Sequence, residues 1–210
     1  MNNIARAAFV FLIIVYTSGV IGMWLRPQMF IPYTPAVLLM FALYFIYVHR
    51  RLSSRFFLAL AVMGALSYAI EVLGVTTAWA FGTYYYGTAF GPKAAGVPLC
   101  ISLNWILVLC ACWGFWSFWK MPFVLQSLLT ALLCTFIDIL MESLAPHFNW
   151  WFFLGGYAGI YNYLCWFLWS FTLALIFKST LMQLKHPIAM HWIILNGLYF
   201  LILNLKFVTL

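Results

Sequence analysis

The sequence predicts an all-α membrane protein, a polytopic bundle of about seven transmembrane helices in a single domain covering residues 1–210. Of the residues, 67% are hydrophobic and only 6% are charged, and the mean hydropathy is +1.05, which excludes an ordinary soluble domain. Apolar stretches near the length needed to cross a bilayer fill almost the whole chain. The basic residues also concentrate in alternate connections, as expected of a polytopic membrane protein.

The predicted helices follow from the apolar stretches and the residues that interrupt them. The first stretch runs on through Trp24 without a cleavage pattern, so we expect it to remain as an anchor. The second has the least certain start, because Pro32 and Pro35 fit either a helix entry or a loop. All eight prolines fall in connections or first turns. The expected helices are Ala7 to Leu25, Ile31 to Val48, Phe56 to Leu73, Val97 to Trp119, Pro122 to Leu144, Tyr157 to Phe177 and Ile188 to Leu205.

The distribution of basic residues predicts the orientation. Seven lie in connections on the N-terminal side: Arg6, Arg50, Arg51, Arg55, Lys120, Lys178 and Lys185. Only Arg26, Lys93 and Lys206 lie on the other side. This bias predicts a cytoplasmic N-terminus, and we expect the membrane to be the inner membrane of a bacterium. The net charge of +7 then indicates contact with anionic lipid rather than nucleic acid.

The cysteines and histidines give little sign of a metal site. All five cysteines fall inside predicted helices, and Cys110 and Cys112 point to different faces. The four histidines have no spacing that places two of them on one helix face. We therefore expect neither a disulfide framework, nor a haem, nor a metal centre.

The chain has only three acidic residues, and all three are expected in the outer half of the membrane. Glu71 is predicted about 3 Å before the end of its helix, with Asp138 about 9 Å and Glu142 about 3 Å before the end of theirs. Asp138 and Glu142 are four residues apart and share one helix face. Asn104 and Asn162 are predicted at the same depth, about 10 Å and 7 Å past their helix starts, with Trp105, Tyr161, Tyr163 and Trp166 beside them.

Two interpretations of this cluster remain open. Ionisable groups inside a bilayer usually mark a functional site, whereas the amides and acids could also be interhelical hydrogen bonds that hold the bundle together. If the cluster is a site, burial and like-charge repulsion disfavour the charged forms of Asp138 and Glu142. One of the pair is then expected to stay protonated near neutrality as a general acid. We find no nucleophile triad, glycine-rich phosphate loop or aspartate-rich diphosphate motif.

One long connection precedes the fourth predicted helix and carries the segments "FGTYYYG" and "GPK". Its glycines permit positive φ angles and close backbone approach, and its aromatic rings could shield a developing carbocation. The alternative for Tyr84, Tyr85 and Tyr86 is an aromatic belt at the membrane interface, which is the better interpretation for at least one of them. Lys93 fits either a headgroup anchor or a partner for Glu71.

Three stretches resemble the integral-membrane carotenoid hydratases, the carotenoid biosynthesis proteins of the bisanhydrobacterioruberin hydratase and γ-carotene 1′-hydratase type. They are "EVLGVTTAWAFGTYYYGTAFGPKAAGVPLCISLNW", "DILMESLAPHFNWW" and "NYLCWF". The resemblance covers the third to sixth predicted helices. It implies that water is added, without a cofactor, across the terminal 1,2 double bond of an acyclic carotenoid end group. The chain departs from the family pattern at Ala78, where glycine is expected, and at Ser143 and Leu144, where proline or valine is expected.

The family's acidic and amide positions correspond to Glu71, Asn104, Asp138, Glu142 and Asn162. Protonation of a trisubstituted alkene gives a tertiary cation that water captures, so the site needs an acid, aromatic shielding and a positioned water. Our hypothesis is that Asp138 protonates the alkene, Glu142 keeps it protonated, and Glu71 or Asn104 holds the water. An exchange of the first two roles is almost as well supported. Substrate- or water-positioning residues are expected to include Asn162, Tyr84, Tyr86, Lys93, Trp105 and Trp166.

Two other functions fit the same residues. A membrane lycopene-type cyclase would begin with the same protonation and end in ring closure, so its product would gain no water. A transporter or seven-helix photoreceptor would use the acids as a proton relay. Lys206 is too near the chain end for a retinal Schiff base, and broken-helix repeats are not evident. The expected partners are a carotenoid and membrane lipid, and the sequence does not predict an oligomeric state.

Overall fold

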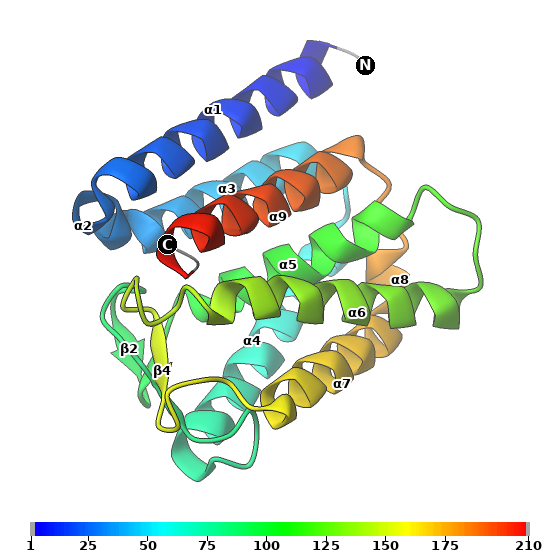
Figure 1. Cartoon of the computed structure of the whole chain (residues 1–210). Coiled ribbons are helices and arrows are strands. Elements are labelled where there is room, and N and C mark those ends of the chain that lie inside the picture. Colours follow the sequence, from blue (N-terminus) through cyan, green and yellow to red (C-terminus); the bar gives the residue numbers. More distant parts are fainter. Residues whose placement is uncertain (1–2, 209–210) are drawn as a thin grey trace.

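The computed structural model describes residues 3–208, and within this range it is built mainly from long helices (Figure 1). The long helices are α1 (Asn3–Leu25), α3 (Thr34–His49), α4 (Ser54–Thr77), α5 (Ile101–Trp116), α6 (Phe123–Glu142), α7 (Ile160–Ile176) and α9 (Pro187–Phe207). The short elements are α2 (Pro27–Phe30), η1 (Ile31–Tyr33), α8 (Lys178–Leu181), β1 (Tyr84–Tyr86), β2 (Lys93–Ala94), β3 (Val97–Pro98) and β4 (Trp151–Phe153).

Four stretches of the described chain are long and apolar enough to cross a membrane: Pro27–His49, Ser54–Thr77, Phe123–Glu142 and Pro187–Phe207. Three other apolar helices, Phe9–Leu25, Ile101–Trp116 and Ile160–Ile176, have 10–17 residues. The expectation of a mainly helical membrane protein is confirmed with these four candidate spans. The count of seven spans and the cytoplasmic N-terminus stay predictions.

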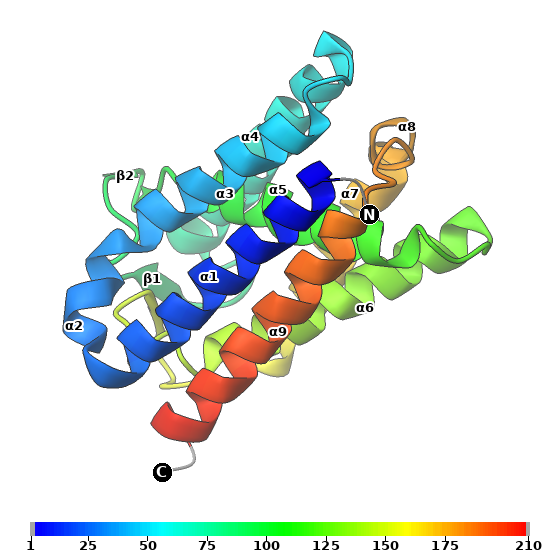
Figure 2. The ribbon, with the colours of Figure 1, turned by 90° about the horizontal axis from the view of Figure 1, so that it is seen from above.

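Helix α5 lies at the centre of the bundle. It contacts α3, α4, α6, α7 and α9, and its residues from Leu107 to Gly114 are all buried. The outer helices instead expose large apolar side chains such as Leu43, Leu58 and Leu132. A bilayer does not penalise exposed apolar surface, so this arrangement fits a bundle whose outer faces contact lipid. Seen from above, α1, α3 and α9 form one side of the bundle (Figure 2).

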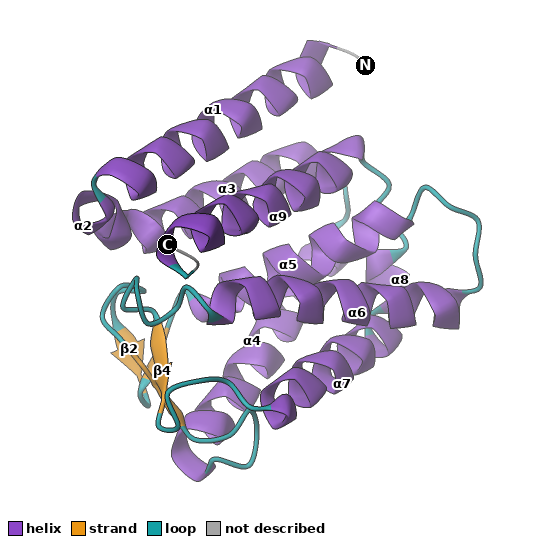
Figure 3. Ribbon diagram, viewed as in Figure 1, coloured by secondary structure: helices purple, strands orange, loops and turns teal. Residues whose placement is uncertain are grey.

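All four strands lie at one end of the bundle, which we call the strand end (Figure 3). Strand β1 pairs with β4 in antiparallel register, Tyr84 opposite Phe153 and Tyr86 opposite Trp151, and β2 pairs with β3. The first pair joins the α4–α5 connection to the α6–α7 connection. Two loops that are distant in sequence are therefore fixed over the same helix ends.

The start of α5 corrects the predicted start at Val97. Val97 and Pro98 form strand β3 instead, and the helix begins at Ile101. The turn between β2 and β3 has positive φ at both central residues, 49° at Ala95 and 79° at Gly96. Such a turn favours Asn-Gly or Asp-Gly, so the Ala-Gly pair gave no clear signal of a hairpin. Asn104 thus lies about 5 Å past the helix start, closer than expected.

The end of α4 corrects the predicted depth of Glu71. The helix continues past Leu73 to Thr77, because the hydroxyls of Thr76 and Thr77 bond to carbonyls one turn back and are satisfied within the helix. Glu71 is therefore about 9 Å from the helix end rather than 3 Å. The next residue, Ala78, ends the helix with a φ of 58°, a left-handed conformation that favours glycine.

The remaining boundaries differ by a few residues. The second predicted helix, Ile31 to Val48, is divided into η1 and α3 and is preceded by the short helix α2, with Pro32 and Pro35 in first turns. Helix α6 ends at Glu142 rather than Leu144, so this acid is the last helical residue and Asp138 is about 6 Å deeper. Helix α7 begins at Ile160 rather than Tyr157, which places Asn162 about 3 Å from its start.

Candidate active site

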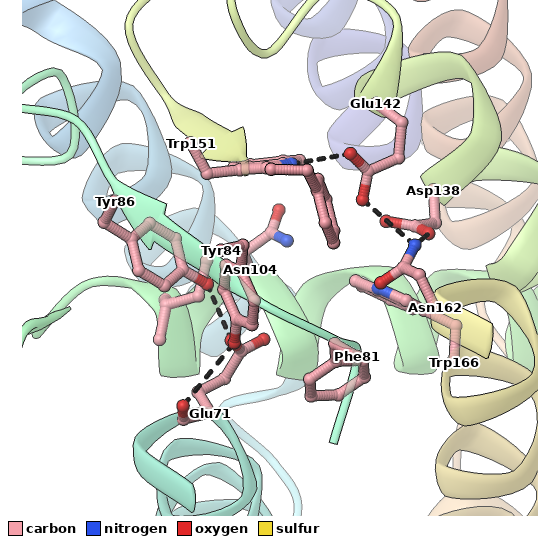
Figure 4. A pocket seen from close by; sticks show the side chains of 12 residues that line it. Glu71, Phe81, Tyr84, Tyr86, Asn104, Asp138, Glu142, Trp151, Asn162 and Trp166 are labelled. Carbon is pink, nitrogen blue, oxygen red and sulfur yellow. Dashed lines mark hydrogen bonds between the residues drawn. The ribbon is translucent and has the colours of Figure 1, made fainter. Parts of the chain in front are cut away.

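One small cavity at the strand end is lined by all three acidic residues of the chain (Figure 4). Its free volume of about 20 Å³ is enough for a water molecule. Helices α4, α5, α6 and α7 and strands β1 and β4 contribute its walls. The lining residues are Glu71, Phe81, Tyr84, Tyr86, Ile101, Asn104, Asp138, Glu142, Trp151, Phe153, Asn162 and Trp166.

Glu71 is buried and accepts three hydrogen bonds. Its Oε2 accepts from the hydroxyls of Tyr84 at 2.5 Å and Tyr86 at 2.8 Å, and its Oε1 accepts from the indole N–H of Trp105 at 2.8 Å. Burial, and then the proximity of Glu71, raise the pKa of both tyrosines above the usual range, so the phenols remain donors. A carboxylate has about four acceptor positions, which leaves Oε1 one position for a further donor.

The other two acids share one amide. The side-chain nitrogen of Asn162 donates to Asp138 Oδ2 at 2.9 Å and to Glu142 Oε1 at 3.1 Å. Trp151 donates its indole N–H to Glu142 Oε2 at 2.7 Å. Asp138 is 0% exposed, and its Oδ1 has no hydrogen-bond partner within the described chain. An unpaired buried oxygen is costly, so this atom marks a place where a proton, a water or a ligand belongs.

Aromatic rings separate the two groups of acids. Trp105 and Trp166 stack with their ring centroids 3.8 Å apart, and Phe81 lies 6.2 Å from Trp105 and 6.4 Å from Trp166. Phe81 is buried with a φ of 64°, which is strained for a bulky residue. The strained backbone places this ring against the cavity. The site thus combines acids with aromatic faces that can stabilise a positive charge.

The "FGTYYYG" segment adopts the geometry expected of its glycines. Gly82 has a φ of 94°, and a Cβ on Gly87 would lie 2.2 Å from the carbonyl oxygen of Asn149. The close approach of these loops fixes β1 against β4. Tyr84 and Tyr86 point into the cavity, while Tyr85 is 50% exposed and stacks on Phe152. The aromatic-belt alternative therefore fits Tyr85 alone among the three.

Two of the expected site residues form no hydrogen bond with the acids in the described structure. Lys93 is exposed and donates to the backbone carbonyl of Tyr86, and no ion pair joins it to Glu71 in the described structure. Its contact supports the β1 backbone rather than an acid. Asn104 lines the cavity, but its side-chain amide makes no hydrogen bond within residues 3–208. This amide is therefore available to a water or a substrate.

Sequence reasoning missed Trp151, Phe153 and Phe81 as site residues. Trp151 lies in the stretch "DILMESLAPHFNWW" and is placed by the β1–β4 pairing, which joins two distant loops and has no local sequence signal. The departure at Ser143 is accommodated, since its hydroxyl bonds to the side chain of Asn204 on α9.

No group of three or more His, Cys, Asp or Glu side chains in the described part of the chain is arranged to hold a metal ion. Two histidines from different parts of the chain lie near each other: the rings of His49, at the end of α3, and His186, just before α9, are 6.1 Å apart. They lie away from the strand end, beside the start of α9.

Comparison with known proteins gives one match. The family model described as carotenoid biosynthesis protein matches residues 33–209, which is most of the chain and includes every residue of the cavity. No curated protein and no solved structure matches the chain. The extent of the family match is sufficient to conclude that the chain belongs to the carotenoid biosynthesis protein family.

Proposed function

We propose that the protein is a carotenoid 1,2-hydratase that adds water to the terminal double bond of an acyclic carotenoid end group. The observation that carries the proposal is the unpaired, buried Oδ1 of Asp138 beside a cavity that is large enough for a water molecule and is lined by aromatic rings. Membership of the carotenoid biosynthesis family supports the substrate class.

The first step is proton transfer from Asp138 to the alkene. The proton forms a bond to carbon 2, and the remaining carbon 1 becomes a tertiary cation. Trp166 and Phe81 present ring surfaces to the cavity and can stabilise this cation by cation–π attraction. A positioned acid of this kind contributes about 10²–10⁴-fold to a rate.

The second step is capture of the cation by water. A water bonded to the free acceptor position of Glu71 Oε1 forms the C–O bond at carbon 1 and gives up a proton to Glu71. Asn104 can orient this water, because its amide is otherwise unbonded in the described chain. Return of the proton to Asp138 restores the site, so the net reaction consumes one alkene and one water.

Asn162 and Trp151 keep Glu142 and Asp138 in place. Since one amide nitrogen bonds to both acids, the two carboxyl groups are held together on one side of the cavity. Two carboxyl groups held this close repel each other when both are charged, so the pair retains a proton, and the first step takes that proton from Asp138.

The test is expression of the chain in cells that accumulate lycopene or γ-carotene, with growth in ¹⁸O-labelled water and mass spectrometry of the pigments. A product heavier by one labelled water supports the hydratase. A product of unchanged mass and altered retention would instead identify a cyclase. The control is Asp138→Asn, which keeps the size of the side chain and, if normally inserted, should form far less labelled product than the wild type.

A further inference from the structure

A second, larger cavity lies beside the acid cavity and has about 150 Å³ of free volume. It runs between α1, α3 and α9 over the start of α5, and its walls include Val15, Leu38, Phe41 and Tyr199. Its lining is apolar except for a few groups, of which Tyr16 and Asn196 bond to each other at 3.1 Å. We call it the apolar groove.

The apolar groove and the acid cavity meet at one residue. Asn104 lines both spaces, and Met141 lines the groove from between the two α6 acids that line the cavity. On the loop side, Trp150 faces the groove and the adjacent Trp151 faces the cavity, with their rings stacked 5.8 Å apart. Asn104 therefore lies at the boundary between the two spaces.

The groove is also open to lipid. Tyr33 is 63% exposed and Val37 is 37% exposed, and both line it on the outer edge of η1 and α3. At its other end Phe41 and Trp192 meet edge to face with centroids 5.8 Å apart, and beyond them is a smaller cavity of about 30 Å³. The groove thus has a lipid-facing side, an aromatic end and a polar exit at Asn104.

From this geometry we infer that the apolar groove binds the section of the polyene chain that follows the reacting end group, while the end group itself passes Asn104 into the acid cavity. The inference rests on the proposed function. The acid cavity has room for about one water molecule, so the reacting end group must widen it and the rest of a long substrate must lie outside it. The groove is the apolar space that adjoins it, and it lets the chain enter from the bilayer without crossing water.

The test compares a long and a short substrate in purified protein reconstituted in lipid. The long substrate is an acyclic carotenoid, and the short one is an acyclic isoprenoid alkene with the same end group but too short to reach Leu38. Leu38→Trp fills the groove, whereas Leu39→Trp, on the neighbouring exposed position of α3, changes the lipid-facing surface.

We expect Leu38→Trp to lower kcat/KM for the carotenoid about tenfold or more, which is a loss of at least about 1.4 kcal/mol of transition-state stabilisation relative to free enzyme and substrate. Conversion of the short alkene should stay near the wild-type rate, and Leu39→Trp should leave both substrates unaffected. Unchanged carotenoid conversion by Leu38→Trp would overturn the inference.

If Leu38→Trp misfolds and converts neither substrate, the inference is tested with Val37→Trp, at the rim of the groove. A selective loss of the carotenoid supports the groove, and wild-type conversion of both substrates overturns it. Failure of the proposed function is distinguishable from these results, because the wild-type protein would then hydrate neither substrate.

Discussion

The hydrogen bonds to Glu71 lead to a prediction about stability that does not depend on the reaction. Glu71→Leu removes the acceptor for three buried donors, whereas Glu71→Gln keeps one carbonyl oxygen in place. In the glutamine variant that oxygen should face Trp105, because an indole N–H cannot accept. The amide nitrogen can then donate to Tyr84 and Tyr86, whose hydroxyl oxygens can accept.

The expected magnitudes follow from the number of stranded donors. In Glu71→Leu the Tyr84 hydroxyl has an alternative acceptor, the backbone carbonyl of residue 71 at 3.5 Å, so two donors remain without partners. At about 1–3 kcal/mol for each, the leucine variant should lose about 2–6 kcal/mol of stability. The glutamine variant should lose about 1 kcal/mol.

The assay is thermal unfolding of purified protein in one detergent, followed by tryptophan fluorescence. For a chain of this size about 1 kcal/mol corresponds to a shift of about 2–4 °C, so the leucine variant should melt several degrees below the glutamine variant. Equal melting temperatures would refute the view that these buried hydrogen bonds anchor β1 to α4 and α5.

Three further predictions test other parts of the account. Ala78→Gly should raise the melting temperature by about 2–4 °C, because glycine relieves the strain of the left-handed backbone at a φ of 58°. A lower melting temperature would show that no strain is stored there. Trp151→Phe keeps an aromatic ring but removes the hydrogen bond to Glu142, so the rate of hydration should fall about tenfold while pigment binding is retained. An equal loss of hydration rate and pigment binding would point to a structural role. If the chain crosses the membrane seven times with its N-terminus in the cytoplasm, its C-terminus lies outside the cytoplasm. A C-terminal alkaline phosphatase fusion should then be active and a C-terminal green fluorescent protein fusion dark. The opposite pattern would reject that topology.

Much of the helical framework could be predicted from hydropathy and proline positions, because both depend on local sequence. The approximate positions of α4, α6 and α9 were foreseen, with errors of a few residues at their ends. The β2–β3 hairpin was not, because Ala95 and Gly96 form its turn without the residue pair that usually marks one.

The candidate site was predictable to the extent that its residues are chemically rare in a bilayer. Three acids in an apolar chain are conspicuous, and the four-residue spacing of Asp138 and Glu142 placed both on one face. The division into a Glu71 group and an Asp138 group was not foreseeable, because it depends on which donors the loops supply. Trp151 is one such donor, and its position follows from a strand pairing between distant loops.

The central claim is that Asp138 delivers the proton to the alkene, and it is tested most directly by comparing Asp138→Asn with Glu142→Gln. Both variants remove an acid without changing side-chain size. Initial rates of carotenoid hydration would be measured with purified protein in lipid, with pigment binding as the measure of correct folding. The account predicts that Asp138→Asn binds pigment but loses about 10²–10⁴-fold in rate, and that Glu142→Gln loses much less. A fully active Asp138→Asn protein, or a larger loss in Glu142→Gln, would contradict it.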